Sequence, residues 1–246
     1  MAIETYIGSG NVIIRPYGSR APFEQVGNCS QLSLDISEDE KTLANFRTPG
    51  GGTYDKVSRI ESVSVALTLH ELTTGNLIRS LYAGSRTLQS EAVASEKQLA
   101  RKGSVTLLDR MPLTVTSVKQ GTTTLEAGVD YTLSGGGIAI PDDSKVADDS
   151  ELTIAYQAAA VDVIEALTQS AGVYEMAFEG MNEAGTGKRC NVRFWRVKIG
   201  AASGLDFIGD DFLGLDVTAE LLLDTTRSAV ADRSGYFRIE KERVAA

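Results

Sequence analysis

Alternating apolar and polar positions predict that much of this chain forms β-strands. In residues 58–70, every second position from residue 63 onward is apolar: Val63, Val65, Leu67 and Leu69. Successive side chains of a strand point to opposite faces, so this segment is expected to place one face against a core. Residues 31–37 and 215–223 alternate in the same way and are also predicted to be strands.

A short helix is predicted directly after the strand at residues 58–70. Thr73 and Thr74 carry hydroxyl groups that suit the N-cap of a helix, and residues 76–82 have apolar side chains at helical spacing. Gly84 is expected to end the helix in a left-handed conformation. A helix at this place is predicted to cover an open sheet.

A β-hairpin is predicted in the last third of the chain. Residues 173–180 and 191–199 are strand-like, and a polar turn at residues 182–188 joins them. Residues 215–223 are expected to pair with residues 236–240. These elements belong to the same domain as the early strands.

Residues 103–156 have a different texture, with short β segments separated by turn residues. The predicted strands are residues 105–108, 113–118, 131–133, 138–140 and 152–156. Several short strands at this spacing are typical of a small β-sandwich or barrel. We therefore expect a small inserted β domain at residues 103–158 and a discontinuous core domain formed by residues 1–102 and 159–246.

The predicted fold class is mainly β, an antiparallel β-sandwich or partial barrel with one short flanking α-helix. Residues 86–100 and 158–170 fit either a helix or a strand, and the sequence leaves both possibilities open. Residues 38–41 are charged and are predicted to form a solvated turn.

A glycine-rich segment follows this turn. Three adjacent glycines, Gly50 to Gly52, argue against regular structure there. The segment lacks the spacing of a phosphate-binding P-loop. We interpret it as the long tip of a hairpin that becomes ordered on contact with a neighbour, and a mobile loop without a partner is the alternative. The segment comprises Phe46, Arg47, Thr48, Pro49, Gly50, Gly51, Gly52, Thr53, Tyr54, Asp55 and Lys56.

The charge and hydropathy of the chain indicate which kinds of binding partner are disfavoured. The chain of 246 residues has 24 basic and 33 acidic residues, for a net charge of −9. This balance disfavours a tight nucleic-acid binder, and it suits either plain solubility or a surface that nucleic acid passes without sticking. No apolar run reaches the ~20 residues that a membrane helix needs. Residues 1–10 do not resemble a secretion signal, so assembly in a cytoplasm is expected.

The inventory of reactive side chains gives little support for catalysis or metal binding. His70 is the single histidine, no nucleophile motif accompanies it, and no local signature marks a glycosidase carboxylate pair. Cys29 and Cys190 are far apart and are expected to be free thiols, with a disulfide as the alternative. An acidic tract suggests calcium, but its spacing does not match an EF-hand loop. We expect no enzyme activity, no cofactor and no metal. The tract comprises Asp142, Asp143, Asp148, Asp149 and Glu151.

The order of the predicted elements forms a recognisable arrangement. Its parts are the strand at residues 32–36, the Pro-Gly-Gly-Gly loop, the strand at 58–70, the helix at 76–82, the hairpin at 173–199 with Phe178-Glu179-Gly180-Met181-Asn182, and residues 211–217 leading to Leu223-Asp224. This arrangement resembles the major tail tube proteins of long-tailed bacteriophages. The resemblance covers most of residues 28–84 and 171–224. In addition, Gly128-Val129-Asp130-Tyr131 with Ile138-Ala139-Ile140-Pro141 is similar to a β module of several phage tail proteins.

The resemblance implies a structural virion protein that forms the conduit for genome ejection. Six copies would form a ring whose inner wall is a closed β-barrel, and rings would stack into a tube. The loop at residues 46–56 would contact the adjacent subunit or ring, and the inserted domain would project outward. DNA would pass along an acidic lumen without tight binding. The candidate lumen residues are Glu175, Glu179, Asp216 and Glu220.

The same resemblance implies the partners and the location. Besides further copies of the chain, the partners would be a tape measure protein, a tail terminator and distal tail proteins. The location would be the virion tail, after assembly in the host cytoplasm. Two alternatives stay open: a sister component, such as a terminator, a distal-tail ring or a secretion-system tube, and a surface β-sandwich module that binds carbohydrate. The absence of a signal peptide and the aromatic content of 7% speak against the carbohydrate module.

Overall fold

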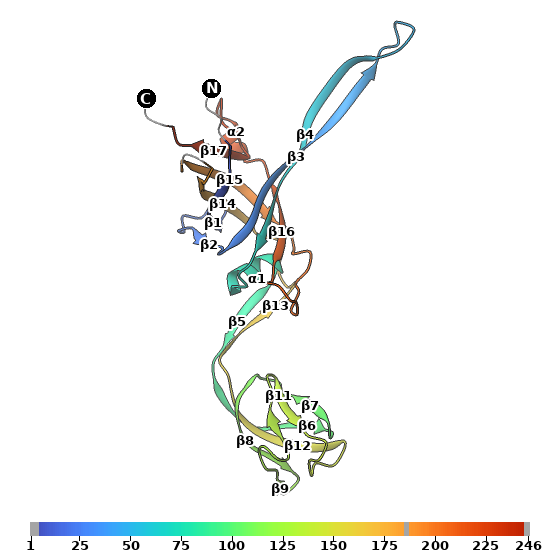
Figure 1. The fold of residues 1–246 in the computed structure, drawn as a ribbon, viewed down its shortest axis with the longest axis vertical. Coiled ribbons are helices and arrows are strands. Elements are labelled where there is room, and N and C mark those ends of the chain that lie inside the picture. Colours follow the sequence, from blue (N-terminus) through green and yellow to red (C-terminus); the bar gives the residue numbers. More distant parts are fainter. Residues whose placement is uncertain (1–4, 185–186, 244–246) are drawn as a thin grey trace. The chain divides into compact units, whose positions relative to one another are not determined.

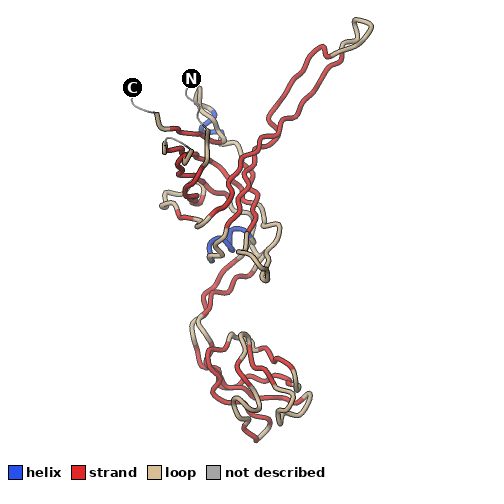
Figure 2. The backbone as a smooth tube through the Cα atoms, viewed as in Figure 1, coloured by secondary structure: helices blue, strands red, loops and turns tan. Residues whose placement is uncertain are grey.

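The computed structural model describes residues 5–184 and 187–243, and its chain is mainly β-strand with two short helices (Figures 1 and 2). It divides into two compact units. Unit 1 comprises residues 1–84 and 164–246, and unit 2 comprises residues 85–163. No helix among the described residues has the length and apolar character needed to cross a membrane. Residues 185 and 186 of the predicted turn, and residues 1–4 of the segment compared with secretion signals, lie outside the described residues.

Unit 1 is built on one antiparallel sheet of eight strands. Its elements are β1 (Gly8–Pro16), β2 (Glu24–Gln25), β3 (Cys29–Ala44), β4 (Thr53–Leu69), α1 (Thr74–Ser80), β14 (Val173–Asn182), β15 (Arg189–Ile199), β16 (Leu215–Leu221), α2 (Thr225–Ser228) and β17 (Phe237–Lys241). The strand order is β2-β1-β14-β15-β16-β4-β3, and β17 pairs with β15 off this path. The predicted hairpin of residues 173–199 is therefore confirmed as β14 and β15.

The sheet of unit 1 folds over its own inner face. Val12 and Ile14 of β1 share a hydrophobic cluster with Val65 and Leu67 of β4, although several strands separate β1 from β4 in the sheet. Val217 of β16 joins the same cluster. In a flat sheet, side chains of strands this far apart would not touch. The sheet must therefore curl so that the inward-facing side chains of β1 and β4 meet. Among the described strands no sheet closes into a barrel.

Helix α1 covers one end of this core, as the sequence predicts. Thr73 is its N-cap and accepts a hydrogen bond from the backbone N–H of Asn76. The helix runs from Thr74 to Ser80, so it begins and ends earlier than predicted. The expected stop at Gly84 is wrong, because Tyr82 takes the left-handed conformation with φ of 49° and Gly84 already belongs to the next strand.

Asn76 ties α1 to the sheet from a buried position. Its amide Nδ2 donates to the backbone oxygen of Val26 at 2.7 Å and to that of Glu71 at 2.8 Å. Arg79 donates from Nη2 to the Asn76 side-chain oxygen at 3.0 Å. Burying a polar side chain is tolerated when its donors and acceptors are paired, and here they are.

Unit 2 is a small sandwich of two antiparallel sheets. Its elements are β6 (Glu91–Ala100), β7 (Ser104–Leu107), β8 (Pro112–Gln120), β9 (Thr123–Thr124), β10 (Thr132–Leu133), β11 (Gly137–Ile140) and β12 (Ser150–Ala158). One sheet has the order β6-β12-β8-β9 and the other β10-β11-β7. Ile154 of β12 and Ile138 of β11 lie in one buried cluster, so the two sheets pack face to face.

Asp130 fixes a turn at the edge of this sandwich. It is buried, and its carboxylate accepts hydrogen bonds from the backbone N–H groups of Glu126 at 2.9 Å and Lys145 at 3.2 Å. The hydrogen bond from Glu126, helped by that from Lys145, lowers the pKa of Asp130 although burial opposes the shift. The Gly-Val-Asp-Tyr motif of the sequence therefore has a structural role here.

A two-stranded ribbon, β5 (Gly84–Leu88) paired with β13 (Val161–Glu165), connects the two units along the chain. In both segments that the sequence left undecided, the regular structure is strand: β5 and β6 include most of residues 86–100, and β13 lies within residues 158–170. Unit 2 begins at Ser85, whereas the sequence analysis places its start at residue 103. The difference arises because β6 pairs with β12 over most of its length, a partnership between segments about 60 residues apart.

Two further predictions in unit 1 are wrong. Residues 38–41 form no turn, because each pairs with β4 inside the long strand β3. Residues 236–240 do not pair with residues 215–223: β17 pairs with β15, and β16 lies between β15 and β4. The alternation of side chains defines a strand but does not specify its partner.

We predict that Asn76→Ala destabilises unit 1 by about 1 to 3 kcal/mol, because the buried oxygen of Val26 and the partly buried oxygen of Glu71 lose their donor. Urea denaturation followed by the fluorescence of Trp195, the single tryptophan, reports on unit 1. Asn11→Ala on an exposed position of β1 is the matched control and should stay within about 0.5 kcal/mol of the parent. Equal effects of the two variants would contradict the anchoring role of Asn76.

We also predict that residues 85–163 fold when expressed alone, since the members of their core cluster all lie within unit 2. Circular dichroism should show a cooperative thermal transition. A non-cooperative melt would mean that unit 2 needs unit 1 for its stability.

Candidate functional site

The most unusual feature of unit 1 is a two-stranded arm formed by the outer halves of β3 and β4. We define the arm as residues 38–61. Register pairs run along it from Glu38 opposite Ile60 to Ala44 opposite Thr53. Every described side chain of the arm's strands is exposed, whereas the next part of β4, from Val63 to Leu69, alternates into the core. Figure 1 shows the ribbon continuing past the other strands of the sheet.

A register shift marks the point where the arm leaves the sheet. It lies between the pairs of Ser37 with Ser62 and Glu38 with Ile60, so Glu61 is the extra residue. Such a bulge bends a strand pair and increases its twist. In β4 the bulge coincides with the change from alternating burial to full exposure, so it separates the arm from the packed part of this strand.

The arm exposes several large apolar side chains. Exposure of these apolar side chains to water is unfavourable, and a ribbon of only two strands has no second layer against which they could pack. At the tip, the N–H of Asn45 donates to the oxygen of Gly52 at 2.7 Å, and three successive glycines have positive φ. The exposed apolar side chains are Leu43, Phe46, Tyr54, Val57 and Ile60, with Phe46 the most exposed at 86%.

The predicted contact segment, residues 46–56, consists of two parts in the structure, a loop and the start of a strand. Residues 46–52 form the tip, as the hairpin interpretation requires, but Thr53 to Lys56 belong to β4 and form regular pairs with β3. The sequence analysis did not predict these pairs, because each carries mixed charged and polar side chains on both faces. Lys56 also forms an ion pair with Glu40 at 2.7 Å.

The four candidate lumen residues all lie on the outer face of the sheet. Asp216 and Glu220 alternate with core residues of β16 and are exposed. On β14, Glu179 is exposed as well, but Glu175 is buried. Asp216 accepts a hydrogen bond from the hydroxyl of Thr68 at 2.6 Å.

Glu175 is a partner of two arginines. Arg15 of β1 donates from Nε to Oε2 of Glu175 at 2.6 Å, and Arg193 of β15 lies 4.0 Å from Oε1. A carboxylate in this setting is neutralised and held in place. Glu175 is thus buried among its partners, in contrast to the exposed Asp216 and Glu220.

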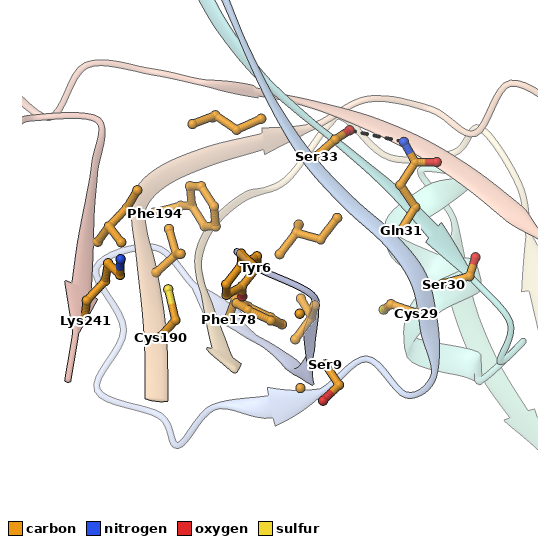
Figure 3. Close-up of a pocket in the computed structure, with 17 residues that line it drawn as sticks. Tyr6, Ser9, Cys29, Ser30, Gln31, Ser33, Phe178, Cys190, Phe194 and Lys241 are labelled. Atoms are coloured by element: carbon orange, nitrogen blue, oxygen red, sulfur yellow. Dashed lines mark hydrogen bonds between the residues drawn. The ribbon is translucent and has the colours of Figure 1, made fainter. Parts of the chain in front are cut away.

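A groove of about 640 Å³ opens between β1 and β3, the two sides on which the sheet is unfinished (Figure 3). Strand β2 pairs with Ile13 and Ile14, so among the described residues Gly8 to Asn11 of β1 has no strand on its outer edge. Strand β3 pairs with β4 and, within the described chain, with no other strand. The groove thus has two strand edges as its rims.

The base of the groove is the hydrophobic core itself. Phe178 of β14 and Phe194 of β15 line it, with Leu32 on the opposite wall. Cys29 enters from β3 and Cys190 from β15, and both are free thiols (Figure 3). The sequence analysis missed this groove because its residues come from five segments that only the curled sheet brings together.

Sequence reasoning also missed an exposed apolar loop between β15 and β16. Phe207, Ile208 and Phe212 are 82%, 96% and 91% exposed. These apolar residues stand among aspartates and follow neither the period of a strand nor that of a helix, so the sequence pattern does not reveal them as a surface feature. Their exposure becomes visible only in the structure.

The single histidine has a structural partner. His70 Nδ1 lies 3.0 Å from the backbone oxygen of Leu213. Within the described residues, no group of three histidine, cysteine or acidic side chains is arranged to hold a metal ion. The acidic side chains of unit 2 instead include ion pairs such as Arg101 with Asp149 at 2.8 Å.

Comparison with protein families places the chain. A family profile described as "Protein of unknown function UCP028589" matches residues 5–240. The chain belongs to this family. A comparison with curated proteins finds no match. The matched residues include parts of both units.

We predict opposite outcomes for two glutamates on one strand. Glu175→Gln should destabilise unit 1 by about 1 to 3 kcal/mol, because Arg15 loses a charged acceptor at a partly buried site. Glu179→Gln is the matched control, and its effect should stay within about 0.5 kcal/mol. Urea denaturation with Trp195 fluorescence measures both. A Glu175→Gln variant as stable as the parent would contradict the neutralising pair.

Proposed function

We propose that this protein is a structural component that assembles with copies of itself into stacked rings, forming a tube of the phage tail type through which a genome passes. The observation that carries the proposal is the arm of residues 38–61. An isolated ribbon of two strands is marginally stable in water, and this one also exposes large apolar side chains. A neighbouring copy that covers the arm would stabilise the ribbon and bury its apolar side chains.

The unfinished edges of the sheet support the same conclusion. Exposed strand edges pair with other chains unless something covers them, and β3 offers an edge 16 residues long. A closed ring of copies leaves no free edge, because each copy completes the border of the next. The proposed ring has six copies, as the resemblance to tail tube proteins implies.

The outer face of β16, β4 and β3 has the chemistry that a genome conduit needs. Asp216 and Glu220 alternate there with Thr218, and the neighbouring outward positions of β4 include Ser64 and Thr68. Carboxylates repel phosphates, and small hydroxyl side chains offer no strong grip. We infer that this face lines the lumen, with Glu175 excluded because it is buried and paired.

In this proposal unit 2 projects outside the tube, and the protein belongs to the virion tail after assembly in the host cytoplasm. The partners would be a tape measure protein in the lumen, a terminator at one end and distal tail proteins at the other. A terminator or distal-tail ring, a secretion-system tube and a carbohydrate-binding surface module are the rival functions.

Negative-stain electron microscopy of the purified chain distinguishes these functions. Long hollow tubes are expected. Single rings that do not stack would favour the terminator or distal-tail role. A monomer at all concentrations, together with binding on a glycan array, would favour the carbohydrate module and end the tube proposal.

We predict that removal of the arm abolishes assembly and leaves the fold intact. The variant lacks residues 39–59 and joins Glu38 to Ile60 through Asn-Gly, since these two residues are paired and Asn-Gly forms a tight hairpin turn. It should unfold with the same cooperativity as the parent but show no tubes in the microscope.

Leu107→Ser is the control for this experiment. Leu107 is an exposed apolar residue of unit 2, with 67% exposure, so the substitution removes apolar surface away from the arm. This variant should form tubes like the parent. Tubes from the armless variant would show that the arm is not the assembly contact.

A further inference from the structure

Strand β15 carries two arginines on the outer face of the sheet, one on each side of Trp195. Phe194 and Val197 are buried in the core, so the alternation of side chains directs Arg193 and Arg196 to the opposite face. A register shift places Trp195 and Arg196 together opposite a single residue of β14. The bulge thus brings to one face two arginines that a regular strand would place on opposite faces.

The chain supplies too few carboxylates for these arginines. Glu175 is the β14 residue opposite the bulge, and Arg15 of β1 already donates to it from Nε at 2.6 Å. The Arg193 Nη2 atom lies 4.0 Å from the same carboxylate, too far for a hydrogen bond. Within the described residues, Arg196 has no carboxylate at ion-pair distance, and its Nε is buried without a hydrogen-bond partner. Three guanidinium groups thus share one carboxylate, which leaves an excess of two positive charges.

The other acidic side chains around β15 do not cancel this excess. Two of them are paired with arginines of their own, and Glu220 of β16 stands in register with Lys198. Glu179 lies diagonally across from Arg193 on β14, but it is exposed and its charge is screened by solvent. The two pairs are Asp224 with Arg227 at 3.5 Å and Glu240 with Arg238 at 2.6 Å.

Aromatic rings hold both arginines in place. The guanidinium carbon of Arg193 lies 5.2 Å from the centre of the Trp195 ring, and that of Arg196 lies 5.6 Å from the centre of the Tyr17 ring. A guanidinium group placed over a ring keeps N–H groups on its edge for a further partner, and this planar fork matches two oxygens of a phosphate. Because the side chains are already ordered, binding costs less entropy.

We propose that Arg193 and Arg196 form a binding site for a phosphate group on the outer face of β15. A phosphate monoester carries a charge of about −1.5 to −2 at pH 7, so it matches two excess positive charges better than a carboxylate, which carries a single charge. The phosphate belongs either to a free phosphate ion or to a nucleic-acid backbone. The inference goes beyond the proposed function, because the site lies within one copy and does not require assembly.

The single tryptophan gives a direct test, since Trp195 lies between the two arginines. Its fluorescence is followed while potassium phosphate replaces potassium chloride at neutral pH and constant ionic strength. We expect a saturable change with half-saturation at roughly 1–10 mM, as two charge-assisted contacts at a partly exposed site imply. Acetate, which presents a carboxylate, should give no saturable change. The absence of a phosphate response, or an equal response to acetate, would overturn the site.

Variants identify the residues that bind. Arg193→Gln and Arg196→Gln should each raise the half-saturating phosphate concentration by about tenfold or more. Glu175→Gln should lower it, because the site loses its one carboxylate. Arg101→Gln removes an exposed arginine of unit 2 and is the matched control, with parent-like binding expected. Parent-like binding by both arginine variants would contradict the assignment.

A second measurement does not depend on tryptophan fluorescence. Phosphate should raise the urea midpoint of the parent, measured by circular dichroism, since a ligand that binds the folded state stabilises it. The midpoint of Arg193→Gln should not respond. Arg196→Lys keeps the charge at the partly buried position and loses the planar fork, so it should fold and bind phosphate more weakly than the parent. Binding by Arg196→Lys as tight as that of the parent would contradict the role of the fork.

A short DNA duplex identifies the source of the phosphate. If its backbone is the ligand, the duplex should act at a lower phosphate concentration than the free ion, and its affinity should fall with salt with a log–log slope of about −2, as two phosphate contacts imply. If free phosphate is the ligand, the duplex should leave the fluorescence unchanged. Tubes without any phosphate response would overturn this inference alone, and a phosphate response from a protein that stays monomeric would overturn the tube proposal alone.

Discussion

The pairing of β3 with β4 is the interaction on which unit 1 depends. The inner halves of these strands supply part of the core, and the outer halves continue the same ladder into solvent as the arm. The same pair of strands thus belongs both to the buried core and to the exposed ribbon. The bulge at Glu61 lets the ribbon bend away without breaking the pairing.

The curl of the sheet sets the remaining geometry. Because β1 and β4 must bury their apolar faces in one cluster, the sheet folds over, yet β2 is too short to cover β1 and the described chain provides no strand beyond β3. The result is a groove whose floor is core and whose rims are strand edges. A packed domain usually covers such surfaces with its own chain, so their exposure here is the physical argument for neighbours.

Polar pairing decides which charges can act on a partner. Glu175 and Glu179 belong to one strand and one face, but Arg15 and Arg193 neutralise the former and leave the latter in solvent. A similar division exists in unit 2, where Asp130 is committed to backbone N–H groups. Net charge by itself therefore overstates how many carboxylates are exposed at the surface.

Several elements follow from local patterns in the amino-acid sequence. The alternation at residues 63–69, the Thr73 cap of α1, the hairpin of β14 and β15 and the short strands of unit 2 depend on neighbours in the chain, and each was predictable from side-chain period and turn residues. The tertiary structure decided everything that joins distant segments: the pairing of β17 with β15, the inclusion of β6 in unit 2, the burial of Glu175 and the groove that brings Cys29 and Cys190 to opposite walls. The physical reason is that a period of two specifies the faces of a strand, whereas its partner, and the side chains it will meet, are chosen by the packing of the whole sheet.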